Sequence, residues 1–164
     1  MMTVLPETTL DKKMDKHKSR RRIAREFVLQ GIYQWKIAGG TASFIEQQLR
    51  ESDEFKHVDE KHFSRLLHGV LQDVEGLGTH IQPCLDRPLH ELSPVELAIL
   101  LLSTFELIHH LEIPYRAIIN EAIELARTYG GSDGYKYVNG VLDKLAVQLR
   151  AVEIEAQRLA KTQA

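Results

Sequence analysis

Hydrophobic residues recur every three or four positions along most of the chain, which is the spacing of an amphipathic α-helix. The first such stretch predicts a helix over residues 18–38. Its inward-facing positions are Ala24, Phe27, Val28, Ile32 and Trp35. Gly39 and Gly40 follow at once, and glycine favours helix ends because it tolerates a left-handed backbone. We therefore expect the first helix to stop at Ala38.

Two further helices are expected in the first half. Ser43 and Glu46 have the spacing of a capping box, which predicts a short helix from Ser43 to Arg50. Apolar residues from Phe63 to Leu77 then form one helical stripe. We expect that helix to continue past Gly76 and to end at Pro83, because proline cannot continue a helix.

The second half opens with a strong helix start at Ser93, Pro94 and Glu96, which suit the cap, the first position and the third position. The helix behind it is apolar around most of its circumference, so we expect it at the centre of the core. A helix over 115–129 follows, and Asp133 is a candidate cap for a last helix that continues to about residue 150.

No segment alternates with period two over the length of a strand. The fold class is therefore predicted to be all-α, with six or seven helices in two packed bundles. We place the halves at 18–82 and 88–150, either side of Pro83 and Pro88. Residues 1–17 are expected to be a disordered basic arm, and residues 151–164 a helical extension or a frayed tail.

Charge is distributed unevenly, although the net charge of the chain is only −2. Residues 12–25 contain eight basic residues and one acidic residue. A basic segment ahead of an acidic body favours a polyanionic partner, and a solvated tail is the alternative. Basic side chains at the start of a helix oppose its dipole, which suggests that they serve a ligand. The residues expected on one side of these first turns are Lys18, Arg21, Arg22 and Arg25.

No motif for catalysis, metal or cofactor binding is apparent in the sequence. Cys84 is the only cysteine, and the histidines do not have the i, i+4 spacing of helical metal ligands. The glutamates of the second half are expected on solvated faces; they are Glu106, Glu112, Glu121 and Glu124. We expect a cytoplasmic binding protein, without membrane contact, and not an enzyme. Its RNA-stacking candidates include Tyr33 and Tyr137, whereas Trp35 lies on the apolar stripe and is assigned to the core.

Two stretches of the chain are distinctive: RRRIAREFVLQGIYQW and IPYRAIINEAIELARTYGGSDGYKYVNGVLDKL. Both resemble the NusB family of transcription antitermination factors, and the resemblance extends over about residues 19–150. It implies two packed helical bundles that bind the boxA RNA of ribosomal and phage leader transcripts as a heterodimer with the ribosomal protein NusE. It also implies NusA, NusG and RNA polymerase as further partners, and leaves open a homodimer.

Carried over residue by residue, the resemblance implies an RNA surface with one partner contact. The positions matching RNA-contacting residues are Arg21, Arg22, Arg25, Tyr33, Asp133 and Tyr137. Glu96 matches a position that contacts NusE. Tyr137 stands where the family more often has phenylalanine, which keeps the stacking face and adds a hydroxyl group.

Two alternatives stay open at this point. The chain is also similar to the RNA-recognition domain that precedes an rRNA cytosine methyltransferase, although no cofactor-binding sheet is predicted here. It is alternatively a protein–protein scaffold whose basic arm is incidental. Replacing the arginines with acidic residues distinguishes the scaffold, because its function would survive that change.

Overall fold

A computed structural model describes residues 18–163, and the regular elements in that part of the chain are all helices, with no strand. The α-helices are α2 (Arg20–Ala38), α3 (Ala42–Leu49), α4 (Glu60–Gln72), α5 (Val74–Ile81), α6 (Pro94–His109), α7 (Tyr115–Tyr129), α8 (Gly134–Leu149) and α9 (Ala151–Thr162). Short 3₁₀ turns lie at Asp53–His57, Gln82–Cys84 and Leu89–Glu91. The all-α prediction is confirmed, and the expected arm at residues 1–17 lies outside the described residues.

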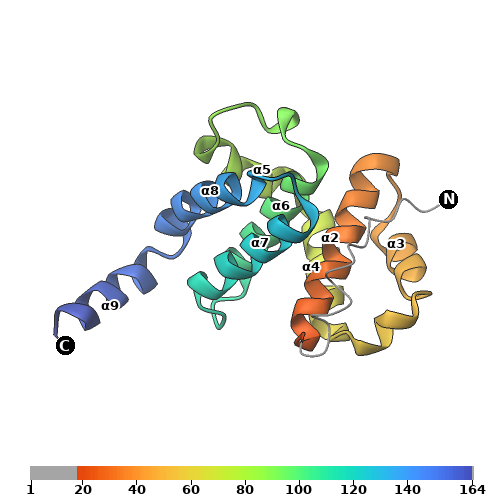
Figure 1. Cartoon of the computed structure of the whole chain (residues 1–164), viewed down its shortest axis with the longest axis horizontal. Helices are drawn as coiled ribbons and strands as arrows, with labels where there is room; N and C mark the ends of the chain where they lie inside the picture. Colours follow the sequence, from red (N-terminus) through yellow and green to blue (C-terminus); the bar gives the residue numbers. More distant parts are fainter. Residues whose placement is uncertain (1–17, 164) are drawn as a thin grey trace.

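Helix α6 is the centre of the molecule, as its apolar circumference predicts. Every residue from Leu97 to Leu107 is buried. On one side α6 packs against α2 and α4, and on the other against α5, α7 and α8. Figure 1 shows the two resulting groups of helices, with α2, α3 and α4 beside α6 and α7. One hydrophobic core runs through both groups.

Local capping chemistry explains where α2 and α3 begin and end. Ser19 Oγ accepts a hydrogen bond from the Arg22 amide at the start of α2, and Gly39 ends the helix with φ +75°. The start of α3 differs from the prediction. Its cap is Thr41, whose hydroxyl accepts from the Phe44 amide, and not Ser43, which lies inside the helix. Threonine and serine are both good caps, so the sequence did not distinguish them.

The long third helix predicted from Phe63 to Pro83 is divided at Asp73, where the backbone leaves helical geometry. Helix α4 stays with the first group, whereas α5 turns to pack against α6. The turn lets Leu77 and Ile81 bury completely. The predicted continuous helix is therefore two helices, because burying α5 on α6 stabilises the fold more than an unbroken helix would.

The C-terminal end of α8 is fixed by one buried arginine. The Arg150 guanidinium donates to the carbonyl oxygens of Leu107, His110 and Ile113, at 2.7, 2.9 and 2.9 Å. These carbonyls lie at the C-terminal end of α6 and just after it, where backbone acceptors lack helical partners. Glu153 bonds both Arg150 and the amide of Tyr115 at the start of α7. The hydrogen bonds of Arg150 and Glu153 thus stabilise the turn between α6 and α7.

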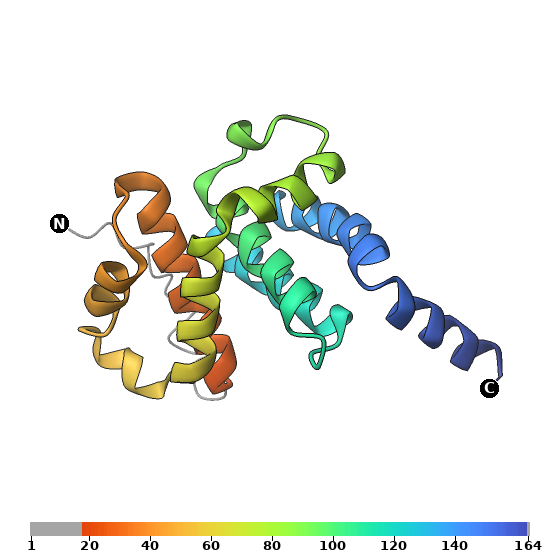
Figure 2. The ribbon, with the colours of Figure 1, turned by 180° about the vertical axis from the view of Figure 1, so that it is seen from behind.

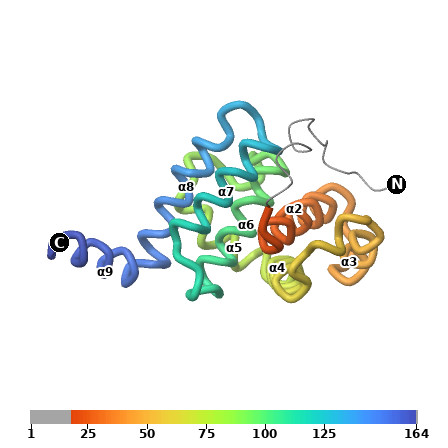
Figure 3. Tube along the Cα trace, turned by 60° about the horizontal axis from the view of Figure 1, so that its bottom comes forward, coloured from red at the N-terminus to blue at the C-terminus, as the bar shows by residue number. Residues whose placement is uncertain are grey.

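Helix α9 extends away from the rest of the molecule. Figure 2 shows it beyond the end of α8, and the tube in Figure 3 shows the same separation from a second direction. None of its residues is buried, and Val152 is 87% exposed. The predicted helical extension over 151–164 is therefore helical to Thr162, as a separate helix and not as a continuation of α8.

Candidate nucleic-acid interface

Three of the basic residues at the start of α2 each face a carboxylate, whereas the Arg20 guanidinium donates to the Val58 carbonyl at 3.0 Å. We call Lys18, Arg21 and Arg22 the basic cluster. The Lys18 ammonium lies 2.9 Å from Glu26 Oε1, and the Arg21 guanidinium 3.8 Å from Asp59 Oδ2. Both acidic partners come from the first group of helices or the turn before α4.

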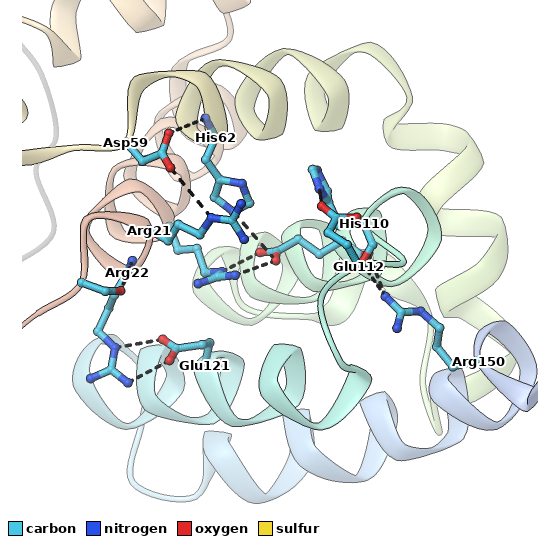
Figure 4. A network of polar contacts seen from close by, with 11 residues as sticks. Arg21, Arg22, Asp59, His62, His110, Glu112, Glu121 and Arg150 are labelled. Atoms are coloured by element: carbon cyan, nitrogen blue, oxygen red, sulfur yellow. Dashed lines mark hydrogen bonds and ion pairs between the residues drawn. The ribbon is translucent and has the colours of Figure 1, made fainter. Parts of the chain in front are cut away.

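The Arg22 guanidinium makes the best-formed of these ion pairs. Its Nε donates to Glu121 Oε2 at 2.9 Å and its Nη2 donates to Oε1 at 2.8 Å. Figure 4 shows this two-bond pair between α2 and α7. The hydrogen bond to Glu121 raises the pKa of Arg22 above its ordinary value. Because 41% of the Arg22 side chain remains exposed, a ligand can still reach the guanidinium.

Arg25 differs from the other predicted RNA-binding arginines because it is buried. Only 8% of its side chain is exposed, and Glu106, its partner on α6, is 1% exposed. The two form paired hydrogen bonds of 2.7 and 2.9 Å. Burial disfavours a charged guanidinium, but the hydrogen bond and the charge of Glu106 outweigh it and raise the pKa of Arg25. The sequence placed Arg25 on one side of the first turns with Arg21 and Arg22, but the fold buries its side chain, so it does not share their exposed surface.

Glu106 also corrects the expectation that the glutamates of the second half lie on solvated faces. Its carboxylate is buried against the Arg25 guanidinium, with His62 Nε2 4.0 Å from its second oxygen. The rings of His62 and His110 are 5.3 Å apart at their centroids. Burial, followed by the charge of Arg25, lowers the pKa of His62 to about 4. The histidine is therefore neutral at pH 7.

A second group of polar side chains surrounds Tyr137 at the start of α8. We call Asp86, Arg87, Glu96, Asp133 and Tyr137 the Tyr137 cluster. The Tyr137 hydroxyl donates to Asp86 Oδ1 at 3.1 Å, and the Arg87 guanidinium lies 4.5 Å from the centre of the Tyr137 ring. Burial and this hydrogen bond raise the pKa of Tyr137. The aromatic ring is therefore already covered by a cation that could itself stack on a base.

Glu96 and Asp133 lie at the same end of the molecule as Tyr137. A methyl group added at Gly134 would sit 3.4 Å from Glu96 Oε1, so this carboxylate touches the start of α8. Asp133 occupies the cap position of α8 but forms no side-chain cap hydrogen bond. Instead its carboxylate is 82% exposed and lies 3.6 Å from Lys136 Nζ. The structure thus brings the predicted partner contact next to two predicted RNA contacts.

Residues near the C-terminal end of α7 contact both the first turns of α2 and the start of α8. The Tyr129 hydroxyl donates to Glu26 Oε2 at 3.4 Å, and Glu26 also pairs with Lys18. The Arg127 guanidinium lies 4.7 Å from the centre of the Tyr135 ring.

Tyr33, like Arg25, is a predicted site residue that no identified side-chain hydrogen bond or ring contact joins to a member of either cluster. It lies about 16 Å beyond Arg22 along α2, at 1.5 Å per residue. Its ring is partly buried against the core. Trp35 is likewise partly buried against the core, as expected from its place on the apolar stripe.

The sequence did not identify several residues that complete this surface. Asp86 and Arg87 lie in a polar loop without a motif, and Glu26 carries no periodic signal. Glu121 lies 99 positions from Arg22, so only the tertiary fold shows the pair. Within residues 18–163, no three histidine, cysteine or acidic side chains gather in a way that could hold a metal ion, and no helix is long and apolar enough to cross a membrane.

Comparison with known proteins gives consistent matches over most of the chain. Residues 22–147 match the model of the NusB family, a range that includes Arg22 but not Lys18 or Arg21. The transcription antitermination protein NusB of Nitrosospira multiformis is 66% identical over 133 residues, which are 81% of this chain and 84% of that protein. The protein of the same name from Paraburkholderia xenovorans is 56% identical over 141 residues, 86% of this chain and 98% of the relative.

A solved structure described as T. maritima NusB superposes on the chain with a TM-score of 0.68. It is 32% identical, and the match covers 79% of this chain and 92% of that one. Sequence identity of this extent and a shared helical fold give the same assignment. The chain belongs to the NusB family.

Proposed function

We propose that the protein is a transcription antitermination factor that binds boxA RNA in the leader transcripts of ribosomal RNA operons. Membership of the NusB family is the observation that carries the proposal, together with relatives named transcription antitermination protein. These relatives do not carry the name of a methyltransferase. The proposed role is that of a regulatory binding protein, not of an enzyme, and it places the protein with the transcription machinery in the cytoplasm.

The proposed RNA path runs from the basic cluster, across the end of α7, to Tyr137. Lys18, Arg21 and Arg22 supply cations for phosphates, which makes the affinity fall with salt. Bases would stack on the aromatic and guanidinium planes around Tyr137 and Tyr135, since single-stranded RNA is read through exposed bases. Arg25 contributes to this surface indirectly, because it is buried and holds the first turns of α2 against α6.

The proposed partner surface lies beside this path. Glu96 is adjacent to the start of α8, so a protein docked on Glu96 would also border the Tyr137 cluster. We propose NusE as that protein, forming a heterodimer that extends a small RNA surface into a larger one. NusA, NusG and RNA polymerase would join this heterodimer on the transcript.

Fluorescence anisotropy tests the proposal with a short labelled boxA RNA and a scrambled RNA of the same composition, with and without NusE, across a salt series. The expected result is a preference for boxA that increases when NusE is added. Arg22→Ala is expected to weaken binding about three- to tenfold with the melting temperature nearly unchanged, because the side chain is partly exposed. Arg158→Ala, on the remote helix α9, is the matched control.

Equal, weak and salt-sensitive binding of both RNAs would contradict the antitermination role and favour the scaffold alternative. An unchanged affinity in Arg22→Ala would instead reject the basic cluster as the phosphate-binding surface. A glutamate-to-arginine change at Glu96 that abolished the effect of NusE but not the binding of boxA alone would support the partner surface.

A further inference from the structure

The basic cluster is neutralised by the protein itself. Each of its three cations lies within ion-pairing distance of a carboxylate: Glu26, Asp59 or Glu121. A surface that binds phosphate through long-range attraction would leave its cations without such partners, because a nearby carboxylate cancels the field that attracts the ligand. The described surface therefore has the side chains for phosphate binding but a reduced positive potential.

Glu121 binds the Arg22 guanidinium in the same geometry that a phosphate group would use. Its two oxygens accept two nearly parallel hydrogen bonds from the guanidinium, at 2.8 and 2.9 Å. Bidentate pairing of this kind is the mode in which arginine also holds phosphate oxygens. A phosphate in the same plane would meet the same two donors. An RNA phosphate bound there would therefore have to displace Glu121 from Arg22.

Helix α7 fixes the competing carboxylate in place. Glu121 lies on a helix whose neighbouring residues Ile119 and Ala122 are buried in the core. Arg22 is fixed on α2 in the same way, by its buried neighbours Ala24 and Arg25. The pair therefore joins two rigid elements, and its partners need little rearrangement to form it. A pre-positioned pair of this kind loses less side-chain entropy than an ordinary surface pair.

We propose that Glu121 is an affinity-limiting residue that competes with RNA phosphate for the Arg22 guanidinium. This inference rests on the proposed function, because it requires RNA to use the basic cluster. The competition lowers the affinity for every RNA by the same factor. Non-specific binding is already marginal at physiological salt, so this factor leaves other transcripts mostly unbound. A target that also gains base stacking and a protein partner remains bound.

The test compares Glu121→Gln with Glu124→Gln in the full-length chain. Glutamine keeps the size of the side chain and removes the charge. Glu124 is the matched control, because it lies one turn away on α7, is also acidic, and pairs with Arg127 instead of Arg22. Binding of the labelled boxA RNA and the scrambled RNA is measured by anisotropy at fixed salt, and folding is checked by thermal unfolding.

Glu121→Gln is expected to bind both RNAs about three- to tenfold more tightly than the wild type, since it removes both the ion pair and a like charge beside the phosphate. Glu124→Gln is expected to change both affinities by less than about twofold. Glu121→Ala, which also removes the hydrogen-bond acceptor, should reproduce the gain.

Two results would overturn the inference. Equal gains in Glu121→Gln and Glu124→Gln would mean that only the general charge of α7 matters. Unchanged or weaker binding in a folded Glu121→Gln protein would mean that Glu121 does not compete with RNA. If Arg22→Ala still weakens binding in that case, the proposed function stands and only the competition is rejected. If no variant or wild type binds RNA, the proposed function itself fails.

Discussion

At the scale of single residues, the pair of Arg25 and Glu106 does most to join the two groups of helices. It is buried, with two short hydrogen bonds between α2 and α6. Arg25→Ala would leave the buried Glu106 carboxyl group without its main partner, and breaking such a buried pair costs about 3–5 kcal/mol. Urea unfolding at pH 7 measures this loss. Arg22→Ala, which breaks a partly exposed pair, is the control and should cost less, about 1 kcal/mol.

Urea unfolding also distinguishes a structural role of Arg25 from a direct role in RNA binding. Replacing both partners, as in Arg25→Met with Glu106→Leu, removes the buried charges together and should recover much of the lost stability. If Arg25→Ala were no less stable than Arg22→Ala, the pair would not be holding the helices together. Loss of RNA binding in Arg25→Ala must therefore be judged only after its folded fraction is known.

His62 gives the free energy of unfolding a dependence on pH. Its pKa is about 4 in the folded protein and about 6.5 in an unfolded chain. Between these values the unfolded state binds a proton that the folded state does not, so stability is complete above pH 6.5 and falls as the pH drops toward 4. The full effect of this shift is about 3 kcal/mol.

Urea unfolding of the wild type and of His62→Gln at several pH values between 7 and 4 measures the difference. The wild type should lose more stability than the variant over this interval. His57→Gln is the control because that side chain lies on the surface. Parallel curves for wild type and His62→Gln would show that His62 takes up its proton equally in both states. Arg25 explains why Glu106 does not prevent the shift, since it already binds both carboxylate oxygens.

At the scale of helices, the close packing of α4 on α6 depends on Gly69. A methyl group at this position would lie 2.2 Å from Cζ of Phe105, inside the ring's contact distance. Gly69→Ala should therefore destabilise the protein by about 1–3 kcal/mol, despite alanine's better helix propensity. Gly140→Ala, on α8, is the matched control because nothing lies within 4 Å of the added methyl group. It should be neutral or stabilising by up to about 1 kcal/mol.

Chemical denaturation of Gly69→Ala and Gly140→Ala measures the free energy of unfolding of each variant. The double variant Gly69→Ala with Phe105→Leu has a smaller side chain at position 105. It should recover part of the lost stability, because the smaller side chain makes room for the methyl group. Equal stability of Gly69→Ala and Gly140→Ala would mean that the ring moves aside at little cost. The helix-packing explanation for Gly69 would then be wrong.

The comparison of helices with the sequence shows what local chemistry determines. Strong signals such as Ser93 with Pro94, and Gly39 with its positive φ, predicted helix boundaries to within a residue or two. The break at Asp73 was missed because the apolar stripe continues through it, and burial of Leu77 and Ile81 on α6 decides the turn. Periodicity describes one face of a helix, but not which neighbour that face meets.

The candidate site was predictable in its residue types and less so in its pairings. The arginine-rich start of α2 was found from charge, but its members separate in the fold into exposed and buried side chains. The separation depends on Glu106 and Glu121, which lie 81 and 99 positions away along the chain. Charge patterns identify cations, whereas only the tertiary structure identifies the carboxylates that hold them.

At the scale of the whole molecule, the folded unit extends past the range of the family match to Glu153. The match ends at residue 147, yet Arg150 and Glu153 hold the turn between α6 and α7. The rest of α9 has no buried residue, although Ile154 packs partly against the core. The stability of the chain should therefore depend sharply on where it is shortened within this segment.

Two shortened chains test this dependence. A chain that ends after Ile154 keeps Arg150 and Glu153 and should unfold within about 1 kcal/mol of the full chain, because only exposed helix is removed. A chain that ends after Leu149 loses the hydrogen bonds to the end of α6 and should be destabilised by about 3–5 kcal/mol. Arg150→Ala in the full chain separates the side chain from the helix and should show most of the larger loss. If the two shortened chains were equally stable, the buried carbonyls at the end of α6 would be satisfied without Arg150, and the folded unit would end with α8.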